Sequence, residues 1–205
     1  MSARRGAAEF LPDGGGLAAL RRAAACCKGC DLYASATQTV FGEGPARARL
    51  MMVGEQPGDR EDLEGHPFVG PAGKVLDRAL EAVGLDRSSI YLTNAVKHFK
   101  FVERGKRRIH KQPTRSEVLA CEPWLEAELR VVKPALVVAL GAVAAKALLG
   151  PQFKVSEQRG AVVLRDSLRV IATVHPSAVL RAPDRKQAFE DFVRDLKVVA
   201  AEMGI

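Results

Sequence analysis

The sequence predicts an α/β fold in which a parallel β-sheet is covered by helices on both faces, a three-layer α/β/α sandwich. Short apolar runs bounded by glycine or polar residues are typical of buried strands. They alternate along the chain with longer segments whose apolar residues recur at helical spacing. The chain has 205 residues, of which 47% are hydrophobic and 27% charged, and this is enough for one sizeable core.

Local signals place each helix and strand of this alternation. Residues 17–27 are rich in alanine and leucine without a breaker, which predicts a first helix. Residues 72–83 repeat apolar side chains at helical spacing before Gly84, and a helix over 115–131 ends ahead of Pro134 because proline cannot continue a helix. The other expected elements are strands at 49–53, 90–93, 136–140, 162–164 and 169–174, a short helix after Gly141, a last helix through 189–199, and polar loops at 55–71 and 94–113.

Composition and charge limit the classes of function that the protein can have. Lysine and arginine outnumber aspartate and glutamate by 31 to 24, a net charge of +7, which favours nucleic acid over a membrane surface as partner. The longest apolar run, residues 135–145, is shorter than the roughly 20 residues that a bilayer requires. We expect a cytoplasmic protein with a flexible lead-in over 1–16 and a single domain over 17–205.

Polar or small residues lie at the carboxyl ends of four of the predicted strands. They are Glu55, Asn94, Gly141 and His175. Ligands of parallel sheets bind outside the carboxyl ends of the strands, so these residues are expected to converge on one cleft. This convergence is the main indication of catalysis that the sequence itself gives.

Two glycine-rich segments resemble phosphate-binding loops but lack their chemistry. GEQPGD (54–59) lacks the lysine and the serine or threonine of a P-loop, and GPAGK (70–74) does not have its spacing, which argues against a nucleoside triphosphatase. Glu55, beside a glycine at a strand end, is instead expected to project into the cleft. The alternative for this residue is a solvated loop glutamate.

Phe68 and Asn94 are candidates for binding a flat base. Phe68 lies between glycines and prolines in GHPFVGPAG (65–73), where it serves either as a stacking platform or as core packing beneath the loop. The amide of Asn94 has one donor and one acceptor group, which match the N3–H and O4 of uracil and mismatch cytosine. Asparagine at a strand end is equally a common cap or turn residue.

The segment KRRIHK (106–111) suits a nucleic-acid backbone. His110 lies inside it, and the neighbouring positive charge is expected to lower its pKa and keep the imidazole neutral at pH 7. A neutral imidazole is a possible nucleophile. Contact with a phosphate is the simpler alternative.

Cysteines and one histidine form a candidate metal site. Cys27 and Cys30 are a C-x2-C pair, and Cys121 and His98 are candidate completing ligands. The pair ends a helix, which does not fit a thioredoxin-type redox site. Zinc and an iron-sulfur cluster with one imidazole ligand both suit this set, and the spacing does not choose between them. Cys26 is expected as a packed thiol, and Cys121 is open to the same interpretation.

Five segments stand in order along the chain: GEQPGD (54–59), GHPFVGPAG (65–73), TNAVKHFKF (93–101), KRRIH (106–110) and VHPSAVL (174–180). Together they resemble the uracil-DNA glycosylase superfamily, in particular the UdgX-type member of its iron-sulfur branch. The resemblance extends from about residue 17 to the C-terminus. It implies a four-stranded parallel sheet between helices, with the expected strand at 162–164 at the edge or in doubt.

The resemblance also implies a cofactor. Iron-sulfur relatives hold a 4Fe-4S cluster with four cysteines, and this chain has His98 where they have one of these cysteines. The implied ligands are therefore Cys27, Cys30, His98 and Cys121. The cluster is expected to be structural and to support DNA binding, without a redox step.

The resemblance implies roles for the residues of the cleft. Uracil is expected to be flipped from DNA or taken from a single strand and stacked on Phe68, while Asn94 reads its edge and Gln56 lines the pocket. His175 resembles the family residue that stabilises the uracil anion.

The KRRIH segment implies capture of the product. His110 is expected to bond to the anomeric carbon, so that the enzyme reacts once. Glu55 is expected to accept the imidazole proton, or to orient the ring and stabilise the cationic sugar. Lys106, Arg107 and Arg108 are expected to hold phosphate and help position His110. The expected partner is uracil-containing DNA, preferably single-stranded, bound by a monomer. The alternatives are a conventional glycosylase with turnover and a non-catalytic nucleic-acid-binding module whose fold is stabilised by a bound metal.

Overall fold

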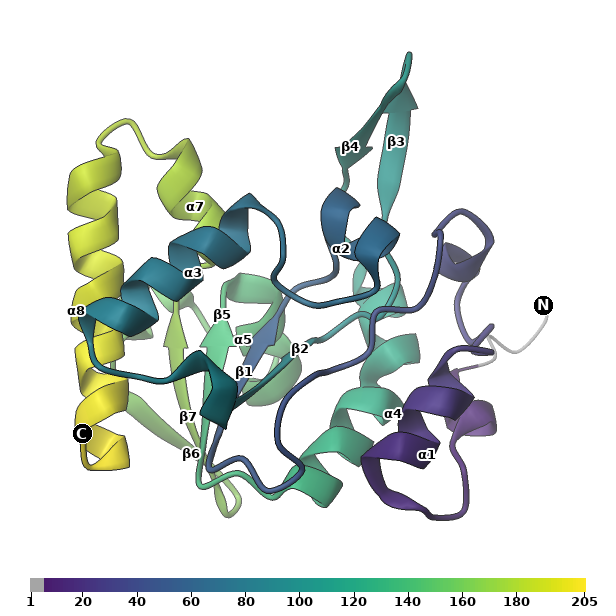
Figure 1. Cartoon of the computed structure of the whole chain (residues 1–205), viewed down its shortest axis with the longest axis horizontal. Coiled ribbons are helices and arrows are strands. Elements are labelled where there is room, and N and C mark those ends of the chain that lie inside the picture. Colours follow the sequence, from purple (N-terminus) through teal and green to yellow (C-terminus); the bar gives the residue numbers. More distant parts are fainter. Residues whose placement is uncertain (1–5) are drawn as a thin grey trace.

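The computed structural model describes residues 6–205. Its middle layer is a five-stranded sheet in the order β2-β1-β5-β7-β6 (Figure 1). Its strands are β1 (Leu50–Gly54), β2 (Ile90–Asn94), β5 (Leu136–Leu140), β6 (Val162–Arg165) and β7 (Leu168–Thr173). The first four strands of that order are parallel, and β6 is antiparallel to β7. The three-layer fold is confirmed, and the strand expected near 162 is a fifth, antiparallel edge strand. Only Asp166 and Ser167 separate it from β7, and so short a connection permits only antiparallel pairing.

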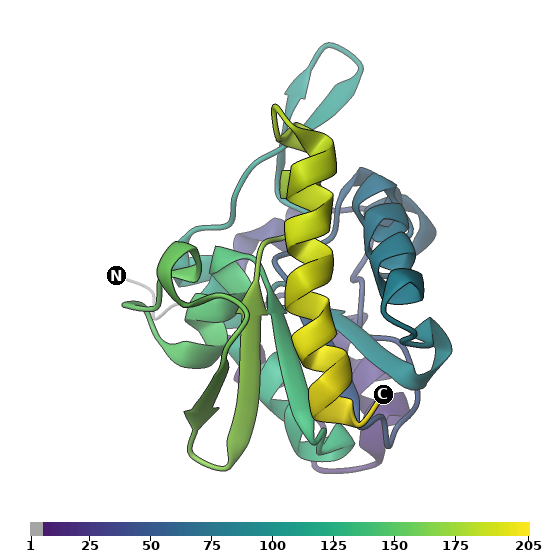
Figure 2. The ribbon, with the colours of Figure 1, turned by 90° about the vertical axis from the view of Figure 1, so that its left-hand side faces the viewer.

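Helices cover both faces of the sheet, as the apolar runs of the strands require. Every residue of β1, β2 and β5 is buried. Successive side chains of β1 point to opposite faces: Met52 packs with α3 (Pro71–Ala82) and α8 (Arg185–Met203), and Met51 packs with α4 (Arg115–Val132) and α5 (Ala142–Leu149). Figure 2 shows α8 lying along one face of the sheet.

The N-terminal region packs against the outer side of α4. Helix α1 (Gly16–Ala24) and the 3-10 helix η1 (Ala7–Phe10) both contact α4, and Ala7 is buried in a third apolar cluster around Trp124. This is where the structure places most of the expected lead-in, whose residues 1–5 lie outside the described residues. The remaining short helices are η2 (Asp31–Ala34), α2 (Asp59–Glu64), η3 (Arg87–Ser89), α6 (Val155–Gln158) and α7 (Pro176–Arg181).

Helix α4 begins and ends where the sequence predicts. Thr114 and Glu117 form a capping box, in which each side chain accepts a hydrogen bond from the other residue's backbone N–H. Lys133 has a φ of 51° and ends the helix one residue before Pro134. In the described part of the chain, no helix combines the length and apolar character needed to cross a bilayer.

Both long loops contain structure that the sequence analysis did not predict. Residues 55–71 include α2, and residues 94–113 include a hairpin of β3 (Phe101–Arg104) and β4 (Arg107–His110), which projects beyond the sheet (Figures 1 and 2). The hairpin turns at Gly105, whose φ of 57° suits glycine. Its strands carry few apolar residues because they pack on no sheet, so their hydrophobic pattern is too weak to predict.

Candidate active site

A cleft of about 690 Å³ opens at the carboxyl ends of the parallel strands. Glu55 follows β1, Asn94 ends β2 and His175 follows β7, and all three line the cleft. A Cβ on Gly141, which follows β5, would lie 2.9 Å from the Cβ of His175, so Gly141 lies directly beside that histidine. Three of the four predicted strand ends therefore meet in this cleft, and the fourth, at Gly141, lies beside His175 without lining it. The cleft is also lined by Gln56, Phe68, His110, Gln112, Ser177 and Arg181.

His110 and Glu55 form a pair at the mouth of the cleft. The Nε2 atom of His110 lies 3.4 Å from Oε1 of Glu55, and their side chains are 52% and 21% exposed. Burial lowers the pKa of His110, and the positive charge of Arg181 lowers it further, so the imidazole is neutral at pH 7. The predicted direction of this shift is therefore confirmed, but its main cause is burial. Burial also raises the pKa of Glu55, against an opposing effect of Arg181.

The side chain of Gln56 ties down the hairpin that carries His110. Its Nε2 donates to the backbone carbonyls of Lys100 and Lys111, at 3.2 and 3.1 Å, and its Oε1 accepts the N–H of Lys100 at 3.2 Å. These two residues flank the hairpin on either side. Gln56 lines the cleft, as predicted, but its amide is committed to the hairpin.

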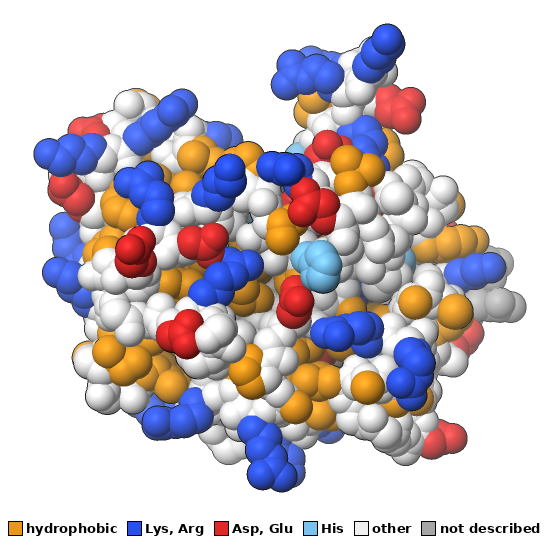
Figure 3. All heavy atoms as spheres, in the orientation of Figure 1, with side chains coloured by type: hydrophobic (Ala, Val, Ile, Leu, Met, Phe, Trp, Pro, Cys, Tyr) orange, Lys and Arg blue, Asp and Glu red, His pale blue; other side chains and the backbone are white. Residues whose placement is uncertain are grey.

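Arg108 is a second anchor of the same hairpin. Its guanidinium donates to the carboxylates of Asp59 and Asp62, both at 2.6 Å, and to the hydroxyl of Thr37 at 3.1 Å. The guanidinium therefore points inward. Lys106 and Arg107 are exposed, and Figure 3 shows basic side chains gathered at the projecting end of the hairpin.

Phe68 and Asn94 meet above the glycine that ends β1. A Cβ on Gly54 would lie 2.7 Å from Cζ of Phe68 and 2.3 Å from Oδ1 of Asn94. Both residues are buried and line the cleft. Within the described residues, the amide of Asn94 makes no hydrogen bond, so its donor and acceptor groups are free for a ligand. Phe68 also packs in the core, as the core-packing interpretation predicts, and its stacking on a base stays a prediction.

His175 presents a neutral hydrogen-bond donor to the cleft. Its Nδ1 accepts the backbone N–H of Ser177 at 3.2 Å, which assigns the proton of the neutral ring to Nε2. Burial lowers its pKa to about 4, with contributions from Arg181 and His110. Its ring lies 6.3 Å from that of Phe68, inclined by 27°.

The sequence analysis did not identify Arg181 or the ion pair beneath Asn94. Arg181 ends α7, donates to the hydroxyl of Ser177 at 3.0 Å and lines the cleft. Its spacing of four residues from Ser177, in a helix opened by proline, is the signal that identifies it. Lys97 is fully buried and donates to the Asn94 carbonyl at 2.8 Å and to Glu128 at 2.5 Å, and this fixes the end of β2.

The three predicted cysteine ligands lie in the apolar cluster around Trp124. The indole N–H of Trp124 donates to the Cys27 sulfur at 3.2 Å, and the Lys97 N–H donates to the Cys121 sulfur at 3.3 Å. Burial raises the pKa of Cys121 to about 12, against an opposing effect of Lys97, and the nearby Cys30 and Cys27 contribute to the rise. Buried thiols that accept N–H donors are suited to a metal centre, which holds them as thiolates.

The fourth predicted ligand, His98, lies next to this cluster. It is buried, its Nε2 is 2.9 Å from the Thr39 hydroxyl, and burial lowers its pKa to about 4, so its ring is neutral as a metal ligand must be. Across the described residues, no three histidine, cysteine or acidic side chains stand close enough together to hold a single metal ion. The prediction for Cys26 is wrong: α1 ends at Ala24, and Cys26 is exposed in the turn that follows.

Comparison with known proteins gives one consistent result. Residues 41–197 match the family model described as the Uracil DNA glycosylase superfamily. The Type-4 uracil-DNA glycosylase of Sulfurisphaera tokodaii is 33% identical over 183 residues, which cover 85% of this chain and 80% of that protein. The Type-4 uracil-DNA glycosylase of Archaeoglobus fulgidus is 36% identical over 172 residues, covering 80% and 83%. The Type-5 uracil-DNA glycosylase of Pyrobaculum aerophilum is 33% identical over 178 residues, covering 78% and 75%.

Proposed function

The chain belongs to the uracil-DNA glycosylase superfamily, and we propose that it excises uracil from DNA and captures the resulting sugar covalently through His110, as expected of a UdgX-type member. The observation that carries the second half of this proposal is the neutral imidazole of His110 held 3.4 Å from the Glu55 carboxylate at the mouth of the cleft. Its substrate is uracil-containing DNA, with single strands preferred.

Recognition of the base uses the inner wall of the cleft. Uracil stacks on Phe68, and the free amide of Asn94 pairs with its N3–H and O4, which cytosine does not match. The N–H at Nε2 of His175 donates to the base. Because this imidazole is neutral, it stabilises the anion that develops on uracil without transferring a proton beforehand.

Cleavage and capture then follow in order. The bond between C1′ and uracil N1 breaks, its electron pair leaves with uracil, and positive charge develops on the sugar. The unprotonated ring nitrogen of His110 donates its lone pair to C1′. Glu55 accepts the remaining ring proton, or orients the ring and stabilises the cationic sugar that forms as the bond breaks. An alkylated imidazole is a poor leaving group, so the adduct persists and each molecule reacts once.

The hairpin contributes both position and charge. Gln56 and Arg108 hold it against the body of the protein and so keep His110 beside Glu55. Lys106 and Arg107, exposed at its end, contact phosphates of the strand, as does Arg181 at the cleft.

Counting uracil released per enzyme tests the proposal. With DNA in excess, release should stop at about one uracil per molecule, because the imidazole is consumed. The second candidate function, a conventional glycosylase, is favoured by the relatives named Type-4 uracil-DNA glycosylase and predicts continued release. Release of many uracils per enzyme would therefore contradict capture while retaining the glycosylase.

Glu55→Gln is expected to slow excision by about 100-fold, since the amide neither accepts a proton nor offsets positive charge. Single-turnover excision of uracil from a labelled oligonucleotide measures the effect. Glu157→Gln is the matched control, because Glu157 is exposed and pairs with the neighbouring Lys154 on the surface. An undiminished rate in Glu55→Gln would remove Glu55 from the mechanism.

Cys27, Cys30, His98 and Cys121 would hold a 4Fe-4S cluster. A single zinc ion needs all its ligand atoms in one coordination shell, whereas each ligand of a cluster binds a different iron. Three cysteine thiolates and one imidazole are ligands that such a cluster accepts. When bound it joins the N-terminal region to α4 and takes no part in bond cleavage.

We expect protein purified without air to be brown, with broad visible absorption and about four iron atoms per chain. Cys121→Ser should lose the colour and unfold at lower temperature, since the buried thiolate is a ligand. Cys26→Ser is the control, because Cys26 is exposed, and it should keep both properties. A colourless wild-type protein with bound zinc would contradict the cluster.

A further inference from the structure

Phe68 has a backbone conformation that its neighbours must hold in place. Its φ is 57°, in the left-handed region that residues other than glycine rarely adopt. The direction of the ring depends on this conformation. Because a Cβ on Gly54 would lie 2.7 Å from Cζ of Phe68, the ring fits closely against the end of β1. A relaxed backbone at Phe68 would swing the ring away from the position where a base stacks.

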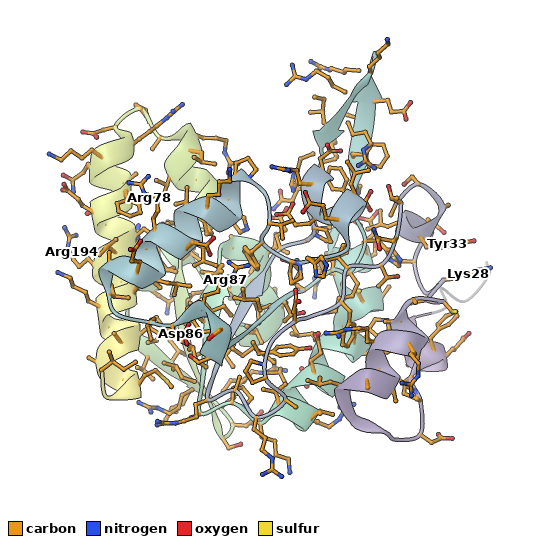
Figure 4. All side chains as sticks on the ribbon, in the orientation of Figure 1. Lys28, Tyr33, Arg78, Asp86, Arg87 and Arg194 are labelled. Carbon is orange, nitrogen blue, oxygen red and sulfur yellow. The ribbon has the colours of Figure 1, made fainter. Side chains whose placement is uncertain are left out.

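Arg87, from η3, binds the backbone of this loop from behind. Its Nη2 donates to the carbonyl of Phe68 at 3.2 Å and to that of Pro67 at 3.3 Å. Its Nη1 pairs with Asp77 of α3. Figure 4 shows the Arg87 side chain extending from η3 toward α3. Arg87 does not line the cleft, so any effect it has on the base must pass through the loop.

The other side of the loop is fixed as well. Glu61 accepts the N–H of Gly70 at 2.8 Å and that of Gly58 at 3.1 Å, which joins the Phe68 loop to the segment after Glu55. A Cβ on Gly73 would lie 1.8 Å from the Phe68 carbonyl oxygen, so α3 closely approaches that carbonyl. The carbonyl is therefore held between α3 and the guanidinium of Arg87.

We infer that Arg87 is a positioning residue for uracil excision, which holds the Phe68 ring in its stacking position by binding the carbonyls of Pro67 and Phe68. The inference rests on the proposed function, because it assumes that Phe68 stacks on the base. Without the guanidinium, the Phe68 carbonyl loses its partner and the left-handed conformation loses its support. The ring then spends less time where the base must lie.

A double-mutant cycle tests this coupling. Single-turnover excision is measured for wild type, Arg87→Ala, Phe68→Ala and the double variant. We expect Arg87→Ala to slow excision by about tenfold, since misplacement of a stacking group acts on the reacting geometry. The double variant should be as slow as Phe68→Ala, because Arg87 acts through a ring that is no longer present. If Arg87 instead only stabilises the fold, the reductions in excision rate caused by the two single substitutions should multiply in the double variant.

Two further variants make the cycle interpretable. Arg87→Gln keeps one amide donor for the two carbonyls, so it should excise uracil faster than Arg87→Ala. If thermal unfolding shows that Arg87→Ala does not fold, Arg87→Gln takes its place in the cycle. Arg78→Ala is the matched control. Arg78 lies on α3 with its guanidinium over the ring of Phe189, 4.9 Å from its centre, and its loss should leave excision unchanged (Figure 4).

The outcomes separate this inference from the proposed function. If Phe68→Ala slows excision but Arg87→Ala does not, or if the two effects multiply, Arg87 is not a positioning residue and the proposed function stands. If Phe68→Ala leaves the rate unchanged, the stacking role fails and the inference fails with it. If wild-type protein excises no uracil, the proposed function itself is wrong and the inference falls with it.

Discussion

His110→Ser should lose covalent capture completely and still excise uracil, now with turnover. Phe68, Asn94 and His175, which hold the base and stabilise its anion, lie on other elements and are unchanged by this substitution. The smaller serine leaves room for water beside Glu55, and water then attacks the sugar in place of imidazole. A denaturing gel measures capture, and uracil released per enzyme measures turnover.

His66→Ser is the matched control for this variant. His66 is exposed and pairs with Glu43 at 3.1 Å, away from the cleft, so its loss should leave capture unchanged. Continued crosslinking by His110→Ser would show that another residue is the nucleophile. Loss of excision together with capture, in a variant that unfolds at the wild-type temperature, would contradict the separation of base removal from capture.

Gly54→Ala should reduce uracil excision by at least about 100-fold, since displacement of binding groups by even one ångström has effects of this size. The new Cβ would lie 2.3 Å from Oδ1 of Asn94 and 2.7 Å from Cζ of Phe68, so neither group can keep its position. Binding of the DNA backbone, which depends on the exposed basic residues, should change little. Single-turnover excision and binding of uracil-free DNA together measure the two effects.

Gly14→Ala is the matched control for Gly54→Ala, because a Cβ at Gly14 has no atom within 4 Å. Both substitutions add one methyl group, but only the one at Gly54 enters the cleft. If Gly54→Ala excised uracil at the wild-type rate, this would show that Phe68 and Asn94 do not jointly bind the base. Equal loss in both variants would point to a general effect of the substitution on the fold.

The central strands and long helices could be predicted because each carries its own local signal. The run at 136–140 is buried at every residue, and β5 spans those residues. Gly84 and Pro134 follow α3 and α4 closely. The hairpin of β3 and β4 could not be predicted, because it is anchored by long-range contacts: Gln56 binds the residues that flank it, and its own Arg108 binds Asp59 and Asp62. The spacing of apolar residues along the sequence gives no indication of such contacts.

The residues of the candidate site also divide into those that could be predicted from the sequence and those that could not. Glu55, Asn94 and His175 could be predicted because each follows a strand of a parallel sheet, and the topology brings them together. Arg181 and Arg87 follow no strand, so they could not be found in this way. The signal for Arg181 is its spacing of four residues from Ser177 within α7, and the role of Arg87 depends on tertiary contacts with the Phe68 loop.

The most direct test of covalent capture mixes the protein with a labelled single-stranded oligonucleotide containing one uracil, followed by heating in detergent and a denaturing gel. We predict a slower, heat-stable band that is absent with thymine in place of uracil, and mass spectrometry should place the sugar on His110. Free abasic DNA without that band, or an adduct on a different residue, would contradict capture by His110.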